Sequence, residues 1–213
     1  MNKKIIALIL AIIVISIVGF GIWMLNSKSN NSSSNRKQNN TINNSNKQEN
    51  NIDKKNSNGK KVAVIYFSAT GTTKRVAETI SNEVGADIIE IVPKEKYTDK
   101  DLDWNNSKSR TSIECNDSDS RPEISNKISV EEYDVIYLGY PIWWGDVPHI
   151  ILTFMDTYKL DGKTVIPFAT SGGTGISESM NTLKKYNKNV NWIDGKRLSS
   201  DSEIKSWINS LKY

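Results

Sequence analysis

The sequence is poor in the side chains that build disulfide frameworks and most metal centres. It has one cysteine, Cys115, and one histidine, His149, among its 213 residues. A single cysteine excludes an intramolecular disulfide and also a cluster of thiolate ligands. A single histidine argues against a histidine-rich metal site and against a serine–histidine hydrolase. We therefore expect neither a disulfide-stabilised fold nor a metal site.

Net charge is also low over residues 60–213, the larger part of the chain. The whole chain has a formal charge of +4 and a pI of about 9.0. Residues 1–59 carry eight Lys and Arg against two Asp and Glu, whereas residues 60–213 carry 20 against 22. The local balances are therefore +6 and −2, so the basic pI belongs to the N-terminal quarter. A nucleic-acid-binding domain usually concentrates basic residues on one face, and we expect no nucleic-acid partner.

The N-terminus contains one long run without charge. Residues 5–25 have no charged side chain, and as a helix they would extend about 31 Å, close to the ~30 Å hydrocarbon core of a bilayer. The sequence predicts a transmembrane anchor over residues 1–25. A cleaved signal peptide is the alternative, although its apolar region is usually shorter. Basic residues on the two sides nearly balance. We expect the domain on the extracytoplasmic side of the cell membrane, because export machinery recognises such leading segments.

Residues 26–59 differ sharply in composition from the rest of the chain. They include 13 Asn and 7 Ser, and their only aliphatic residues are Ile42 and Ile52. Such a segment buries too little apolar surface to offset an ordering entropy of about 1–2 kcal/mol per residue. The sequence predicts a disordered linker here.

Residues 60–213 read as one folded domain of the α/β class. A continuous apolar run predicts a strand at 62–67, and further strands are predicted at 87–92, 133–139 and 164–169, with a weaker one near 190–193. Apolar residues at helical spacing lie between the strands and after the last one. This alternation indicates a doubly wound, five-stranded parallel sheet. Residues 93–129 are too long for a connection and too polar for a core, so we expect a surface insertion with a short helix near 99–106.

The segment after the first strand, Ser68-Ala-Thr-Gly-Thr-Thr73, runs directly into a helix. Hydroxyls beside free amides at a helix N-terminus suit an anion. The Gly-Lys-Ser/Thr of a P-loop and the Rossmann glycine triplet are both missing. The segment therefore favours a phosphate monoester, with an ordinary helix start as the alternative.

Two further segments follow the third and fourth strands: Tyr140-Pro-Ile-Trp-Trp-Gly145 and Thr170-Ser-Gly-Gly-Thr-Gly175. Indole faces suit stacking on a flat heterocycle, although we expect one of the two tryptophans only to pack on the core. Glycine allows the backbone to approach a ligand closely. Ligands of open parallel sheets bind at the carboxyl ends of the strands. The three segments together predict one site for a phosphorylated planar ring.

These segments resemble flavodoxins over about residues 61–213, through Tyr-Phe-Ser-Ala-Thr-Gly-Thr-Thr, Gly-Tyr-Pro-Ile-Trp-Trp-Gly and Phe-Ala-Thr-Ser-Gly-Gly-Thr-Gly. The similarity is greatest to flavodoxin-like proteins with a Trp-Trp-Gly loop. It implies the sheet order 2-1-3-4-5 and non-covalently bound FMN. It also implies which residues contact each part of the cofactor. The phosphate would be held by Ser68, Thr70, Gly71, Thr72 and Thr73. The ring and ribityl chain would be bordered by Pro141, Ile142, Trp143, Trp144 and Gly145, and the far rim would be lined by Ser171, Gly172 and Gly173.

The function that this resemblance implies is electron transfer between protein redox partners at a membrane. One alternative is an NAD(P)H-dependent, FMN-containing reductase of quinones or similar acceptors. Another is a membrane-tethered binding module without catalysis, against which the intact Ser/Thr segment argues. No catalytic residue is assigned.

The remaining polar residues receive structural interpretations. We expect His149 to begin the helix after the tryptophan loop and Cys115 to be a free surface thiol. Arg110, Glu114 and Arg121 are expected to form an internal ion-pair set, with a lid over the ring edge as the alternative.

Overall fold

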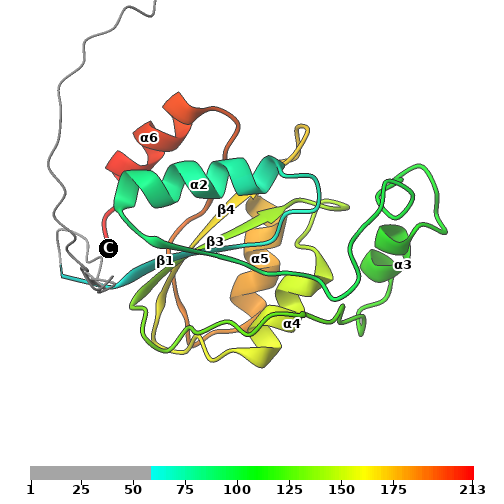
Figure 1. Cartoon of the computed structure of the whole chain (residues 1–213), viewed down its shortest axis with the longest axis horizontal. Helices are drawn as coiled ribbons and strands as arrows, with labels where there is room; N and C mark the ends of the chain where they lie inside the picture. Colours follow the sequence, from blue (N-terminus) through cyan, green and yellow to red (C-terminus); the bar gives the residue numbers. More distant parts are fainter. Residues whose placement is uncertain (1–58) are drawn as a thin grey trace, which may run out of the picture. The chain divides into compact units, whose positions relative to one another are not determined.

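The computed structural model describes residues 59–213. In them a six-stranded sheet is covered by helices on both faces (Figure 1). The predicted anchor, residues 1–25, and all but the last residue of the predicted linker lie outside the described residues. Among the helices of residues 59–213, none has the length and apolar character needed to cross a membrane.

The four long strands form where the sequence predicts them. They are β1 (Val62–Tyr66), β2 (Asp87–Glu90), β3 (Val135–Pro141) and β4 (Thr164–Thr170), and they pair in parallel. With β5 (Asn191–Trp192) at the edge, the order is β2-β1-β3-β4-β5. The predicted order 2-1-3-4-5 is confirmed.

The edge beyond β4 differs from the single fifth strand that the sequence predicts. Both β5 and the additional β6 (Lys196–Arg197) pair with β4. The carbonyls of Val165 and Ala169 accept hydrogen bonds from this edge, so Pro167 between them faces the same side. Proline cannot donate to a ladder, and the edge strand is interrupted beside it.

The helices form two layers. Helices α2 (Thr72–Val84) and α6 (Asp201–Ser210) lie on one face of the sheet, and α4 (His149–Thr157) and α5 (Ser177–Tyr186) lie on the other (Figure 1).

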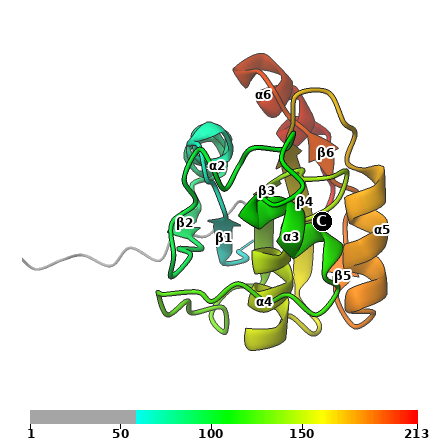
Figure 2. The ribbon, with the colours of Figure 1, turned by 90° about the vertical axis from the view of Figure 1, so that its right-hand side faces the viewer.

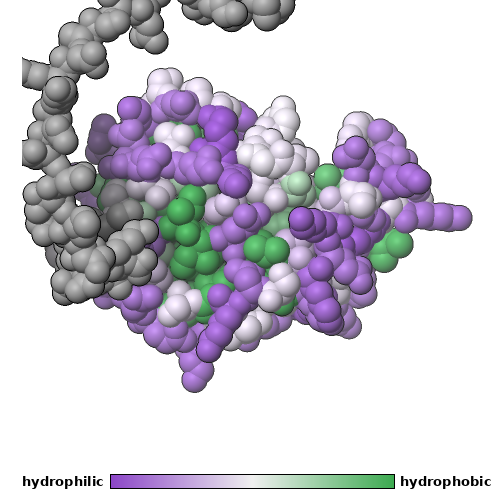
Figure 3. Space-filling view, viewed as in Figure 1, coloured by the Kyte–Doolittle hydropathy of each residue, from purple (hydrophilic) through white to green (hydrophobic). Residues whose placement is uncertain are grey.

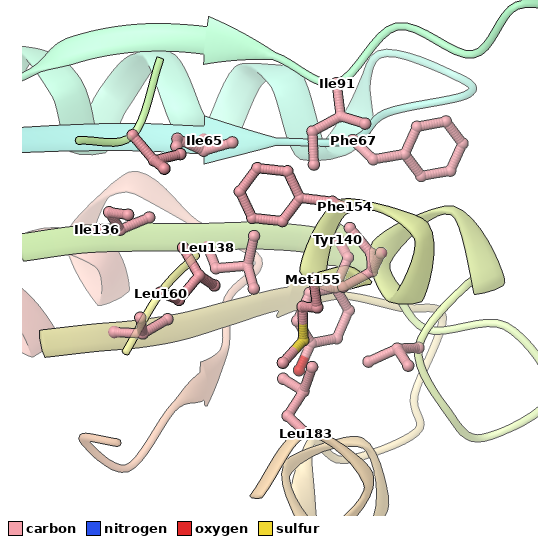
Figure 4. Close-up of a cluster of buried hydrophobic side chains, with 14 of the residues drawn as sticks. Ile65, Phe67, Ile91, Ile136, Leu138, Tyr140, Phe154, Met155, Leu160 and Leu183 are labelled. Carbon is pink, nitrogen blue, oxygen red and sulfur yellow. The ribbon is translucent and has the colours of Figure 1, made fainter. Parts of the chain in front are cut away.

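Alternate residues of β1 enter two separate cores. Val64 packs on the side of α2 and α6, whereas Ile65 packs with Phe154 of α4 (Figure 4). Burial on both faces explains why this strand is apolar throughout.

The insertion contains a helix, but the predicted position near 99–106 is wrong. The helix is α3 (Arg110–Asn116), which begins at Ser109, whose side chain accepts from the amide of Ser112. In the 99–106 segment, side chains of Asp101 and Asp103 accept hydrogen bonds from nearby backbone amides. Such local bonds favour turns over helix. Helix α3 lies beyond the carboxyl ends of the strands (Figures 1 and 2), and the surface around it is mostly hydrophilic (Figure 3).

Candidate functional site

The carboxyl ends of β1, β3 and β4 bring the three predicted segments to one place. They surround a cavity of about 780 Å³. Its lining includes the predicted residues Thr70, Ile142, Trp143, Trp144, Gly145, Ser171, Gly172 and Gly173. The other predicted residues, Ser68, Gly71, Thr72, Thr73 and Pro141, are neighbours of these in sequence and are not part of the lining.

The first segment leaves the start of α2 open. Gly71 precedes the helix with φ +87°, a conformation that glycine adopts without strain, and its amide donates to Ser68 Oγ at 3.1 Å. The hydroxyls of Thr70 and Thr72 are 3.2 Å apart. Within the described residues, no side chain caps the first amides of α2. These amides and the positive end of the helix dipole therefore remain available to an anion.

Thr73 has a different position from the other hydroxyls of this segment. It is only 1% exposed, and its Oγ1 lies 2.8 Å from Oγ1 of Thr170, which is 4% exposed. This buried hydrogen bond connects the start of α2 to the end of β4. Thr73 thus fixes two of the three segments to each other.

The tryptophan loop is a tight two-residue turn. The amide and carbonyl of Trp143 exchange hydrogen bonds with those of Asp146, at 3.0 and 2.9 Å. Trp144 and Gly145 between them have φ of +52° and +85°. Two successive positive φ angles are typical of a type I′ turn, although a tryptophan there is uncommon. The turn leaves Trp144 49% exposed at the cavity.

The two tryptophans do not divide their roles as predicted. Trp143 packs edge-on against Phe67 and Tyr97, with ring centroids 5.4 and 5.1 Å apart. It also lines the cavity, so it is both a core residue and a wall of the site. Trp144 donates from Nε1 to the carbonyl of Thr111 in α3, at 3.2 Å. This bond connects the tryptophan loop to the insertion.

The third segment forms an open rim. Ser171 Oγ donates to the carbonyl of Thr174 at 2.6 Å and accepts from the amide of Gly173 at 3.3 Å. A Cβ placed on Gly172 or Gly173 would meet no atom within 4 Å. The backbone at these two glycines, which line the cavity, is therefore open to the close approach of a ligand.

Sequence reasoning did not assign three wall residues from the insertion. Leu102, Trp104 and Thr111 line the same cavity. Trp104 is 71% exposed. The sequence signal for this wall is Trp104 itself, a large apolar side chain in an otherwise polar segment.

The predicted ion-pair set is only partly formed as expected. Arg110 Nε and Glu114 Oε1 are 2.6 Å apart, and Tyr97 donates to the same carboxylate at 2.7 Å. The Arg110 guanidinium stacks on the Tyr97 ring at 4.0 Å. Arg121 instead pairs with Asp156 of α4 at 2.8 Å. Arg110 and Glu114 therefore hold the Tyr97 side chain in position, and Tyr97 in turn packs against Trp143.

His149 and Cys115 lie outside the cavity lining. His149 is the first residue of α4, as predicted, and burial, followed by the nearby Arg121, lowers its pKa. Cys115 is a free thiol but is half-buried rather than on the surface. Burial raises the pKa of this thiol to about 12, so it is neutral at physiological pH.

Known proteins share this domain. A family model described as flavodoxin matches residues 61–211. A candidate flavoprotein from Bacteroides eggerthii is 47% identical over 72% of this chain and 99% of its own, with a TM-score of 0.68. A similar protein from Bacteroides uniformis is 46% identical over 71% and 99%, with a TM-score of 0.69. A flavoprotein from Lactobacillus acidophilus, solved in complex with FMN, is 29% identical over 70% and 99%, with a TM-score of 0.55. Curated proteins gave no match.

Proposed function

The chain belongs to the flavodoxin family, and on this premise we propose that it carries electrons between redox partners at a membrane. FMN is its cofactor, supported by the family and by the FMN complex of the related Lactobacillus protein. The observation that carries the proposal is the convergence of the three segments on a single cavity.

The residues of this cavity fit the three parts of FMN. Open amides and the hydroxyls of Thr70 and Thr72 suit the phosphate. The exposed indole of Trp144 suits the flat ring. Gly172 and Gly173 leave backbone exposed beside the space that the ring requires. In the described chain, no charged side chain lines this cavity, so an anion there is held by hydroxyls and amides.

The protein's own contribution is to bind, orient and shield the cofactor. FMN supplies the redox chemistry when it is bound. The hydroxyls of Thr70 and Thr72 near the start of α2 would hold the phosphate end in place. Trp143, packed on Phe67 and Tyr97, provides an apolar wall of the cavity that would keep water from the ring. The type I′ turn fixes the positions of Trp144 and the Gly145 peptide, which would contact the ring.

The uncharged lining of the cavity favours a carrier over a reductase. A reductase using NADH or NADPH must also bind the phosphates of the nicotinamide nucleotide, usually with Arg, Lys or a helix N-terminus. Among residues 59–213, the lining of the cavity includes no Arg or Lys, and FMN would itself occupy the open start of α2.

The membrane location is part of the proposal and rests on the sequence alone. Residues 5–25 would anchor the chain, and residues 26–59 would tether the domain at the extracytoplasmic face. Protease added to intact cells should cut the tether and release the domain. Full protection of the chain in intact cells, with cutting only after lysis, would place the domain on the other side.

The carrier is distinguished from the reductase by anaerobic reduction of the purified, FMN-loaded full chain. We expect slow bleaching of the flavin absorbance by NADH and NADPH, and rapid bleaching by dithionite. Rapid bleaching by either nicotinamide, with turnover on a quinone, would establish the reductase instead. A chain that binds no FMN would remove both functions and leave the binding module.

A further inference from the structure

We propose that Trp104, from the 93–129 insertion, forms a second aromatic wall of the cofactor site and stacks on the ring face that Trp144 leaves uncovered. This inference rests on the proposed binding of FMN in the cavity. The inference makes the 93–129 insertion part of the flavin site rather than a surface insertion without a role in binding.

The first support is the composition of the cavity wall. Among the described residues that line it, the aromatic side chains are Trp104, Trp143 and Trp144. Trp143 is occupied by edge contacts to Phe67 and Tyr97. The glycine-rich segment 170–175 contains no aromatic residue. Only Trp104 is therefore available to provide a second stacking surface.

The second support is the exposure of Trp104. Its side chain is 71% exposed, the highest value among the exposed large hydrophobic residues of the described chain. The structure of residues 59–213 records no hydrogen bond or ring contact for its indole, although it lines the cavity. A large apolar surface left at the mouth of a cavity is typical of a ligand contact.

The third support is that Trp104 is held relative to Trp144. The amide of Asn106 donates to the carbonyl of Asp103 at 3.1 Å, and the amide of Asn105 donates to the Asp103 carboxylate at 3.0 Å, which forms a turn around Trp104.

The chain just before this turn is fixed to α3. The amide and hydroxyl of Thr111 both donate to the carbonyl of Asp101, at 3.1 and 2.7 Å. The Thr111 carbonyl in turn accepts from Trp144. Thr111 therefore connects the two aromatic walls through its own backbone.

The test measures dissociation constants of the full chain for FMN and for riboflavin, which lacks the phosphate. Trp104→Ala should weaken both ligands by the same factor, about tenfold, because stacking acts on the ring that they share. Trp104→Phe, which keeps an aromatic face, should recover most of the affinity. Thr70→Val should weaken FMN and leave riboflavin unchanged.

Ile113→Ala is the matched control, because Ile113 is an exposed hydrophobic residue of the same insertion, 56% exposed, outside the cavity lining. It should leave both affinities unchanged. Because Trp104 is mostly exposed, the urea midpoint of Trp104→Ala should equal that of the parent chain.

Unchanged affinity of Trp104→Ala for both ligands would overturn the inference while leaving the proposed function intact. Slower electron exchange with a partner at unchanged affinity would also overturn it, since Trp104 would then be a docking residue. A parent chain that binds neither ligand would overturn the proposed function as well.

Discussion

Replacing Thr73 by valine should destabilise the domain by about 1–3 kcal/mol, because it leaves the Thr170 hydroxyl buried without its partner. The two Oγ1 atoms are 2.8 Å apart, and neither residue is more than 4% exposed. Thr170→Val should have a similar cost for the same reason. Valine has nearly the shape of threonine, so no cavity contributes to either value.

The double variant, Thr73→Val with Thr170→Val, should be much more stable than the sum of the single effects predicts. Replacing both hydroxyls by methyl groups leaves neither one unpaired, and such paired replacements are often nearly neutral. We expect a coupling energy of at least about 1 kcal/mol, within the range for residues in direct contact.

Urea unfolding followed by tryptophan fluorescence measures all four free energies, with an unchanged m value as the check on two-state behaviour. Additive single effects would contradict this prediction, because they would show that the hydroxyls are not partners. FMN titration of the same variants separates two roles of Thr73. A direct phosphate contact predicts a larger loss of affinity in Thr73→Val than in Thr170→Val, whereas a purely positioning role predicts equal losses.

Three further predictions concern single positions. Gly139→Ala should cost about 1–3 kcal/mol in urea unfolding, because its Cβ would lie 2.2 Å from Phe168 Cζ in the core; an unchanged midpoint would contradict this packing. Gly145→Ala should cost about 1–2 kcal/mol through strain alone, since φ is +85° and the space is open, and FMN affinity should fall with it; equal affinity would show that the turn does not position the ring. Cys115 should react with iodoacetamide far more slowly at pH 8 in the folded chain than in urea, because burial raises its pKa to about 12. The unfolded thiol loses its proton first, so stability should fall as pH rises from about 9 towards 12; a flat profile in this window would contradict the assignment.

The strands and the three site segments were predictable because their signals are local. A strand buried on both faces is apolar at every position, as in residues 62–66. In a parallel sheet, the end of each such strand marks where ligand contacts lie. The positions of the long strands and of the candidate cavity both follow from these two facts.

Most features that sequence reasoning missed depend on partners far along the chain, and one depends on local side-chain hydrogen bonds. The break between β5 and β6 follows from Pro167 in a different strand. The hydroxyl of Thr73 is paired with Thr170, and the packing of Trp143 depends on Tyr97. The helix position in the insertion was wrong because side chains such as Asp103 bond to the local backbone, a competition that apolar spacing does not reveal.

Binding of FMN through its phosphate and its ring is tested by titrating the FMN-free full chain with FMN and with riboflavin. We predict one FMN per chain, bound more tightly than riboflavin because the open amides and hydroxyls at the start of α2 hold the phosphate. The double substitution Thr70→Val with Thr72→Val should remove this difference, while Thr79→Val, on the same helix and bonded to its own backbone, should preserve it. No binding, or equal affinity for the two ligands in the parent chain, would contradict the proposed site.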